Sequence, residues 1–124
     1  MLLIQLLYAI ACVNLAYVNF RLIDSGRRVY HALNGLLHLT AAVIVGICVH
    51  PLGAICILLV ARLVFDIALN RFRGLPMNYV PAKPKSIVDR IERWVFGRDG
   101  YEPKLWYLTA LFILNIAIHG TYIG

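Results

Sequence analysis

Charged residues are scarce in this 124-residue sequence, in which Asp, Glu, Lys and Arg together make up 15%, against about 25% in soluble globular domains. Apolar residues account for 61%, against about 45–50% in such domains. A water-soluble domain of this length has a high ratio of surface to volume and cannot bury so many apolar side chains. The shortage of charge therefore excludes an ordinary soluble fold and predicts a protein embedded in a lipid bilayer.

Residues typical of catalytic and metal sites are also few. The only two serines are Ser25 and Ser86, and both fall in predicted loops. The three cysteines, Cys12, Cys48 and Cys56, lie inside apolar runs and lack any metal-ligand spacing. No phosphate-binding loop, nucleophile elbow or zinc motif is present. The sequence therefore predicts a protein that is not an enzyme and that holds no metal and no cofactor.

A b-type haem protein is the one cofactor-binding alternative that stays open. Such a site needs two histidines at the same depth on facing helices. His38 has no histidine partner at its depth, and His50 and His119 both lie toward the opposite face, with His50 at a turn. Haem binding is therefore the least favoured of the functional alternatives.

Four long apolar runs fill most of the chain. A helix needs about 20 residues to cross the hydrocarbon core, and about 17–25 are tolerated. Helices rather than strands are expected, because backbone hydrogen bonds must be satisfied within each segment in lipid and alternating ten-residue segments are absent. The sequence predicts an all-α fold, a single transmembrane domain over residues 1–124 built as an integral membrane four-helix bundle. The predicted spans are residues 1–20, 32–49, 52–70 and 105–123.

Basic residues gather in two segments, 21–31 and 71–104, whereas both termini and the His50-Pro51 turn have no Lys or Arg. With four spans the two basic segments fall on one face, which the positive-inside rule assigns to the cytoplasm. We therefore expect a multi-pass protein of the cell membrane with both termini on the non-cytoplasmic side. The expected partners of the basic residues are the lipid bilayer and its anionic headgroups on the cytoplasmic side. Nucleic acid is not expected, because no recognition module accompanies the positive charge.

The long third connection contains a second kind of helix. Gly74, Pro76, Pro81 and Pro84 predict an extended connector. Ser86 then suits a helix cap, and a helix is predicted at about 86–97. Its apolar residues recur at helical spacing and form one face. The helix is too short to span the membrane. It lies either in the cytoplasmic interface or packed on the end of the bundle, and the amphipathic pattern is compatible with both positions. The residues of this face are Ile87, Val88, Ile91, Trp94 and Val95.

Ionisable groups inside the predicted spans are the candidates for a functional site. Arg62, Asp66 and Asn70 follow one another at intervals of four residues and form a polar stripe on one helix. Arg62 and Asp66 are one turn apart, so the guanidinium can pair with the carboxylate and neutralise both charges.

Other polar residues of the spans lie at a similar depth. Asn14, Asn34 and His38 can join the stripe to form one intramembrane polar cluster in the cytoplasmic half of the bundle. Packing between helices and a pathway for a substrate, ion or proton are the two interpretations of this cluster. Asn115 and His119 form a smaller patch, best interpreted as an interhelical hydrogen bond.

One sequence pattern consists of four short segments in the second half of the chain. They are Arg62-Leu-Val-Phe-Asp66-Ile-Ala-Leu-Asn70, Gly74-Leu-Pro76, Tyr79-Val80 and Lys85-Ser-Ile-Val-Asp89. This pattern resembles small uncharacterised bacterial and phage membrane proteins with four spans. The resemblance implies a prokaryotic or phage setting and no particular chemistry.

Three functional classes follow from these observations. The expected one is a non-enzymatic accessory or assembly protein of the membrane, acting as a homo-oligomer or in a larger membrane complex. The alternatives are a small oligomeric channel, holin-like pore or transporter that uses the stripe of Arg62 and Asp66, and the haem protein. An accessory protein requires a dry, packed stripe, whereas a pore requires a stripe that faces water.

Overall fold

The computed structural model describes residues 1–27, 31–76, 87–96 and 101–123, and every regular element in these ranges is helical. The predicted all-α fold is therefore confirmed for the described residues. Most of the predicted connector, with Pro81, Pro84 and the capping residue Ser86, lies outside them. The elements are α1 (Leu2–Asp24), α2 (His31–Cys48), α3 (Pro51–Val60), the π-helix η1 (Ala61–Phe65), α4 (Asp66–Phe72), α5 (Ile87–Phe96) and α6 (Tyr101–Ile123).

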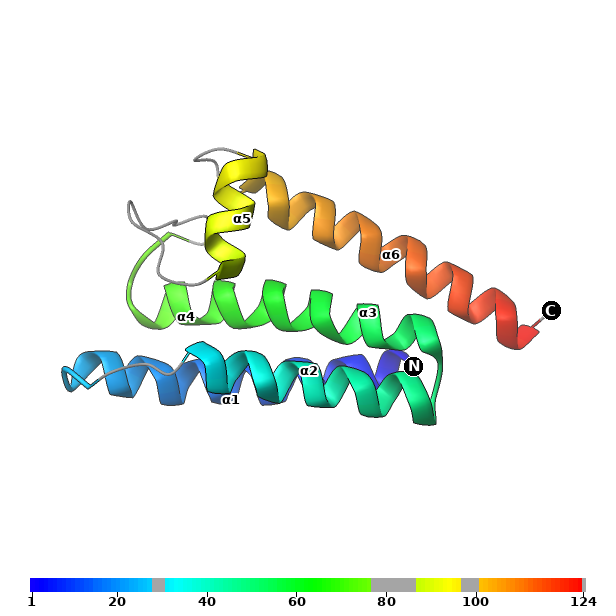
Figure 1. The fold of residues 1–124 in the computed structure, drawn as a ribbon, viewed down its shortest axis with the longest axis horizontal. Coiled ribbons are helices and arrows are strands. Elements are labelled where there is room, and N and C mark those ends of the chain that lie inside the picture. The colour runs from blue at the N-terminus through cyan, green and yellow to red at the C-terminus, as the bar shows by residue number, and fades with distance from the viewer. Residues whose placement is uncertain (28–30, 77–86, 97–100, 124) are drawn as a thin grey trace.

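The segments α3, η1 and α4 follow one another without a break and form a single long helix. It begins at Pro51, where the missing N–H costs no hydrogen bond because the first turn has no partner for it. The backbone N–H of Leu52 donates to Nδ1 of His50 at 3.1 Å, so the imidazole caps this helix. The sharp turn after Cys48 lays α2 antiparallel against α3 (Figure 1).

Two helices, α1 and the α3–η1–α4 helix, are long and apolar enough to cross a membrane. The apolar part of α2, Ala32–Cys48, is shorter. Helices therefore occupy the four apolar runs, and a bundle of four membrane spans belongs to the proposal below.

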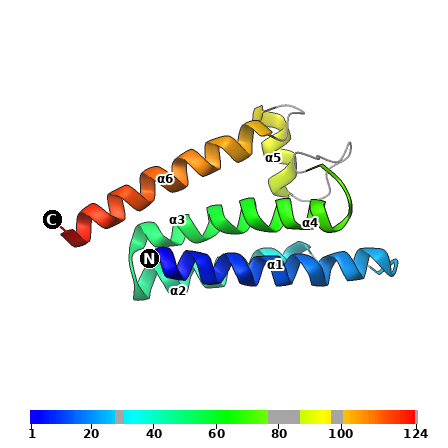
Figure 2. The ribbon, with the colours of Figure 1, turned by 180° about the vertical axis from the view of Figure 1, so that it is seen from behind.

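The helices α1, α2 and α3–η1–α4 lie side by side, and α6 leans against them at an angle (Figures 1 and 2). The C-terminal part of α6 is close to α3, and its N-terminal part is separated from the long helix by α5, which lies crosswise. Both chain termini and the α2–α3 turn are at one end of the molecule, and the ends of α1 and α4 are at the other.

Small side chains fill the interior between α1, α2 and α3. Ala16, Ala42 and Cys56 are almost fully buried. Gly53 marks the tightest point, because a Cβ there would lie 2.9 Å from Cγ1 of Val45 on α2. Close backbone approach through Gly, Ala and other small residues is typical of helices that associate in a lipid environment.

Large apolar side chains cover the outside of the molecule. Residues of this kind are exposed along α1, α2, α5 and α6, among them Leu2, Ile47, Trp94 and Phe112. A water-soluble monomer rarely exposes a continuous apolar surface of more than a few hundred Å². Some large side chains, such as Ile57 and Ile118, are buried as well, but the extent of exposed apolar surface suits a surrounding of lipid.

Candidate functional site at the junction of η1, α5 and α6

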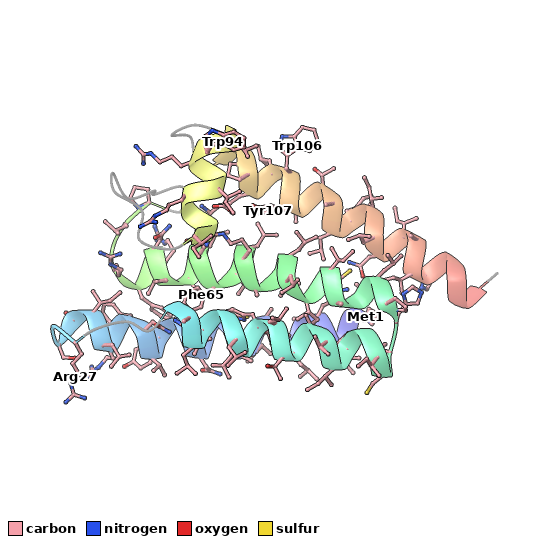
Figure 3. The ribbon with its side chains drawn as sticks, in the orientation of Figure 1. Met1, Arg27, Phe65, Trp94, Trp106 and Tyr107 are labelled. Atoms are coloured by element: carbon pink, nitrogen blue, oxygen red, sulfur yellow. The ribbon has the colours of Figure 1, made fainter. Side chains whose placement is uncertain are left out.

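Glu92 of α5 joins three helices through its carboxylate. Nε of Arg62 donates to its Oε1 at 2.8 Å, and Nη2 of Arg62 pairs with its Oε2, so the guanidinium binds the carboxylate through both oxygens. The hydroxyl of Tyr107 on α6 also donates to Oε1, at 2.6 Å. Figure 3 shows Tyr107 on the inner side of α6, toward the long helix. A two-point contact of this kind fixes orientation as well as charge.

A second ion pair lies next to the first. Nζ of Lys104, one turn before Tyr107 on α6, is 2.9 Å from Oδ2 of Asp66. The Lys104 and Asp66 side chains are 13% and 27% exposed, and those of Arg62 and Glu92 are 24% and 15% exposed. We call Arg62, Asp66, Glu92, Lys104 and Tyr107 the charged cluster. Its two positive and two negative side chains leave no net charge.

The partners of Arg62 and Asp66 differ from the prediction that these two residues pair with each other. The ion pairs described here run from the long helix to α5 and α6. Arg62 lies inside η1, where the turn is wider than in an α-helix, so residues four apart no longer stand directly above one another. The correction is that these two charges are neutralised between helices, by Glu92 and Lys104.

Asn34 and His38, the two α2 members of the predicted polar cluster, are bound to α1. Nδ2 of Asn34 donates to Oδ1 of Asn19 at 2.9 Å, and Nδ2 of Asn19 lies 3.5 Å from Oδ1 of Asn34, so the two amides bind each other. The hydroxyl of Tyr8 is hydrogen-bonded to Nδ1 of His38 at 2.5 Å. These contacts hold α2 to α1 and are separate from the charged cluster.

The His38 ring lies at the depth of η1. Its centroid is 5.8 Å from that of Phe65, in an edge-to-face arrangement. Phe65 is labelled in Figure 3, on the side of the long helix that faces α1 and α2. Asn70 is buried on α4, whereas Asn14 is exposed on the outside of α1. Of the predicted cluster, only Arg62 and Asp66 therefore belong to the charged cluster.

A reciprocal amide pair also links the first and last helices. Nε2 of Gln5 donates to Oδ1 of Asn115 at 2.7 Å, and Nδ2 of Asn115 donates to Oε1 of Gln5 at 3.1 Å. The expected interhelical hydrogen bond of Asn115 is present, with Gln5 as its partner. His119 is exposed on α6.

The predicted interfacial residues face outward. Ile87, Ile91, Trp94 and Val95 are exposed on α5, and the side chain of Val88 lies outside the described residues. Glu92 lies on another side of this short helix and points into the charged cluster. The helix thus directs Glu92 to the protein and these apolar residues to the surroundings, where Arg90 is exposed as well.

The described polar side chains satisfy one another. Within the described ranges, no buried side-chain nitrogen or oxygen lacks a hydrogen-bond partner. The same part of the chain contains no group of three or more His, Cys, Asp or Glu side chains placed to hold a metal ion. The charged cluster therefore acts as a neutral, internally paired connection between helices.

The cluster residues that sequence reasoning missed are Glu92, Lys104 and Tyr107. Glu92 lies off the apolar face of an amphipathic helix, where a glutamate is usually solvated, so the pattern gives no sign of a partner. Lys104 and Tyr107 are one turn apart on α6, as Arg62 and Asp66 are on the long helix. That similar spacing marks a polar side of α6 but does not identify the partners of Arg62 and Asp66.

Comparison with protein-family models, with curated proteins and with solved structures finds no match. Function is therefore inferred from the charged cluster, the amide pairs and the distribution of apolar surface.

Proposed function

We propose that the chain is a four-span integral membrane protein that serves as a non-enzymatic accessory or assembly protein. Its spans are α1, α2, the α3–η1–α4 helix and α6, and α5 belongs to the cytoplasmic side. Association with copies of itself or with a larger membrane complex is part of this proposal, because four thin helices leave most of their apolar surface on the outside.

The pairing within the charged cluster is the observation that supports this function best. A pore or transporter needs charged groups that meet water or a substrate. Here the guanidinium of Arg62 is held by Glu92, and the ammonium group of Lys104 is held by Asp66. Charges that neutralise one another serve helix packing and orientation rather than conduction.

The arrangement of the ends supports the proposed topology. The termini and the α2–α3 turn share one end of the molecule. Arg21, Arg71 and Arg73 are exposed near the other end, where α1 and α4 finish. Such an asymmetry is what the positive-inside rule requires of four antiparallel spans.

Accessibility scanning with single cysteines tests the dry cluster. Cys12, Cys48 and Cys56 are replaced by Ala, and one cysteine at a time is placed at positions 61 to 70 of the reconstituted protein. A membrane-impermeant maleimide is expected to leave these positions unlabelled. Arg73→Cys, at an exposed position, is the labelled control. Labelling at every third or fourth position would contradict the proposal and favour an oligomeric pore.

The accessory role is tested on the intact protein in its own membranes. Chemical crosslinking followed by purification in mild detergent is expected to yield an assembly larger than one chain. The purified protein is expected to give no ion current in a planar bilayer. A reproducible current that is lost in Asp66→Asn would contradict the accessory function.

A further inference from the structure

The α5 helix is oriented opposite to a helix packed on a water-soluble core. Successive residues of an α-helix are rotated by about 100°, which brings Ile87, Ile91, Trp94 and Val95 within one arc. All four are exposed, Trp94 to 86%. A helix on the surface of a soluble protein buries such an arc and exposes its charges. In α5 the charge of Glu92 points inward and the apolar arc points outward.

The α5 helix contacts the long helix well before its end, at a level that the proposed membrane function puts inside the cytoplasmic leaflet. Glu92 binds Arg62, which precedes Phe72, the last residue of α4, by ten residues. At 1.5 Å per residue this is about 15 Å along the helix axis. Figures 1 and 2 show α5 crosswise beside the α4 end of the long helix.

The apolar arc of α5 continues into the apolar surface of its neighbour. Leu105 and Trp106, in the first turns of α6, are exposed as well, and Figure 3 shows Trp106 on the outer side of that helix. Arginines are exposed at the same end of the molecule, on and just after α1 and α4. These are Arg21, Arg27, Arg71 and Arg73. Cationic groups at the same end of the molecule as an apolar surface are complementary to a leaflet that contains anionic lipid.

We propose that the outward face of α5, made by Ile87, Ile91, Trp94 and Val95, binds lipid in the cytoplasmic leaflet. The four side chains contact acyl chains just below the headgroups, and anionic lipids are enriched around the helix. The proposal rests on the membrane function above and names lipid as the occupant of this face. The pairing of Glu92 with Arg62 and Tyr107 holds the helix in this orientation.

The two tryptophans of the chain allow a direct test. Trp106→Phe leaves Trp94 as the only indole, and Trp94→Phe leaves Trp106 as the matched control. Each full-length variant is reconstituted in nanodiscs of phosphatidylcholine and phosphatidylglycerol. In one set the acyl chains are brominated near the headgroup, and in another iodide is added to the water. Trp94 is expected to lose fluorescence to the brominated chains and to keep it in iodide.

Two outcomes for Trp94 would overturn the proposal, and one for Trp106 would overturn the membrane function. Quenching by iodide without quenching by brominated lipid places the face in water and overturns the proposal. Protection from both quenchers indicates that protein covers the face, such as a second copy of the chain, and overturns it too. If Trp106 also escapes brominated lipid, the membrane function itself fails.

The preference for anionic lipid has its own readout. At equal mole fraction, brominated phosphatidylglycerol is expected to remove more Trp94 fluorescence than brominated phosphatidylcholine. Equal loss with the two lipids would overturn the enrichment of anionic lipid around α5.

Discussion

Two parts of the molecule are held together by different forces. The unit of α1, α2 and the long helix packs through small buried side chains such as Ala16, Ala42 and Cys56, and through neutral amide contacts. The unit of α5 and the N-terminal half of α6 is joined to it by the charged cluster. In lipid, apolar side chains gain nothing by leaving one apolar surrounding for another, so helices associate through close packing or polar contacts. The first unit combines close packing with neutral polar contacts, whereas the second is joined to it by charged ones.

The largest effect is expected from removing one charge of the cluster. Glu92→Ala leaves the Arg62 guanidinium without its carboxylate in a poorly hydrated place, which costs about 3 kcal/mol. Thermal unfolding in detergent measures the loss, and hydrogen exchange is expected to show it in α5 and α6 while α1 and α2 stay protected. Arg71→Ala, at an exposed position on α4, is the control and is expected to change stability by less than about 1 kcal/mol.

A double variant makes the same comparison sharper. Arg62→Met with Glu92→Leu removes both charges and keeps apolar side chains of similar length. Because well-packed apolar residues replace buried ion pairs with little loss, this variant is expected to recover most of the stability lost in Glu92→Ala. An additive loss would show that Glu92 acts through Tyr107 rather than through Arg62.

A smaller effect is expected from overfilling the close-packed unit. Gly53→Val places a branched side chain against Val45 at the tightest helix contact, which costs about 2 kcal/mol. Gly35→Val is the matched control, because nothing lies within 4 Å of a Cβ at Gly35. Equal unfolding temperatures for the two variants would contradict the close approach of α2 and α3.

The neutral amide pairs are expected to contribute less. Asn19→Leu and Asn34→Leu, alone and combined, form a double-mutant cycle across α1 and α2. Hydrogen bonds between membrane helices are worth about 0.6 kcal/mol, and the coupling energy of this pair is expected to be of that size. A coupling as large as that of Arg62 and Glu92 would remove the contrast between the two units.

The smallest effect is expected at Asn14, which is exposed on the outside of α1. Asn14→Leu replaces a polar side chain at a surface of apolar neighbours, so the unfolding temperature in detergent is expected to stay the same or to rise. A marked fall would show that Asn14 has a polar partner in an assembly of several chains.

The positions of the helices could be predicted from the sequence because each one depends on the hydropathy of its own residues. The apolar runs 32–49 and 52–70 correspond to α2 and to the long helix, and the turn between them follows from His50-Pro51. The helix predicted at 86–97 is Ile87–Phe96. In each case the residues that decide the element lie within it.

The contacts of the charged side chains could not be predicted in the same way. The residues Arg62 and Glu92 are separated by 30 positions, and the sequence around each residue does not indicate the other as its partner. Two features of the three-dimensional structure decide the pairing, namely the π turn around Arg62 and the crosswise position of α5. The spacing of four residues predicts Asp66 as the partner of Arg62 only if the helix is a regular α-helix throughout.

The π segment has a consequence for how one helix serves several neighbours. A single residue more per turn shifts the angular phase of everything after it by about 100°. The side chains of α3 and of α4 can thus face different neighbours, although the two segments belong to one continuous helix. The α3 segment packs on α2 and α6, and the α4 segment packs on α1. Loss of one residue from Ala61–Phe65 would restore a uniform pitch, and it would turn Asp66 and Asn70 away from their present neighbours while α3 stayed unchanged.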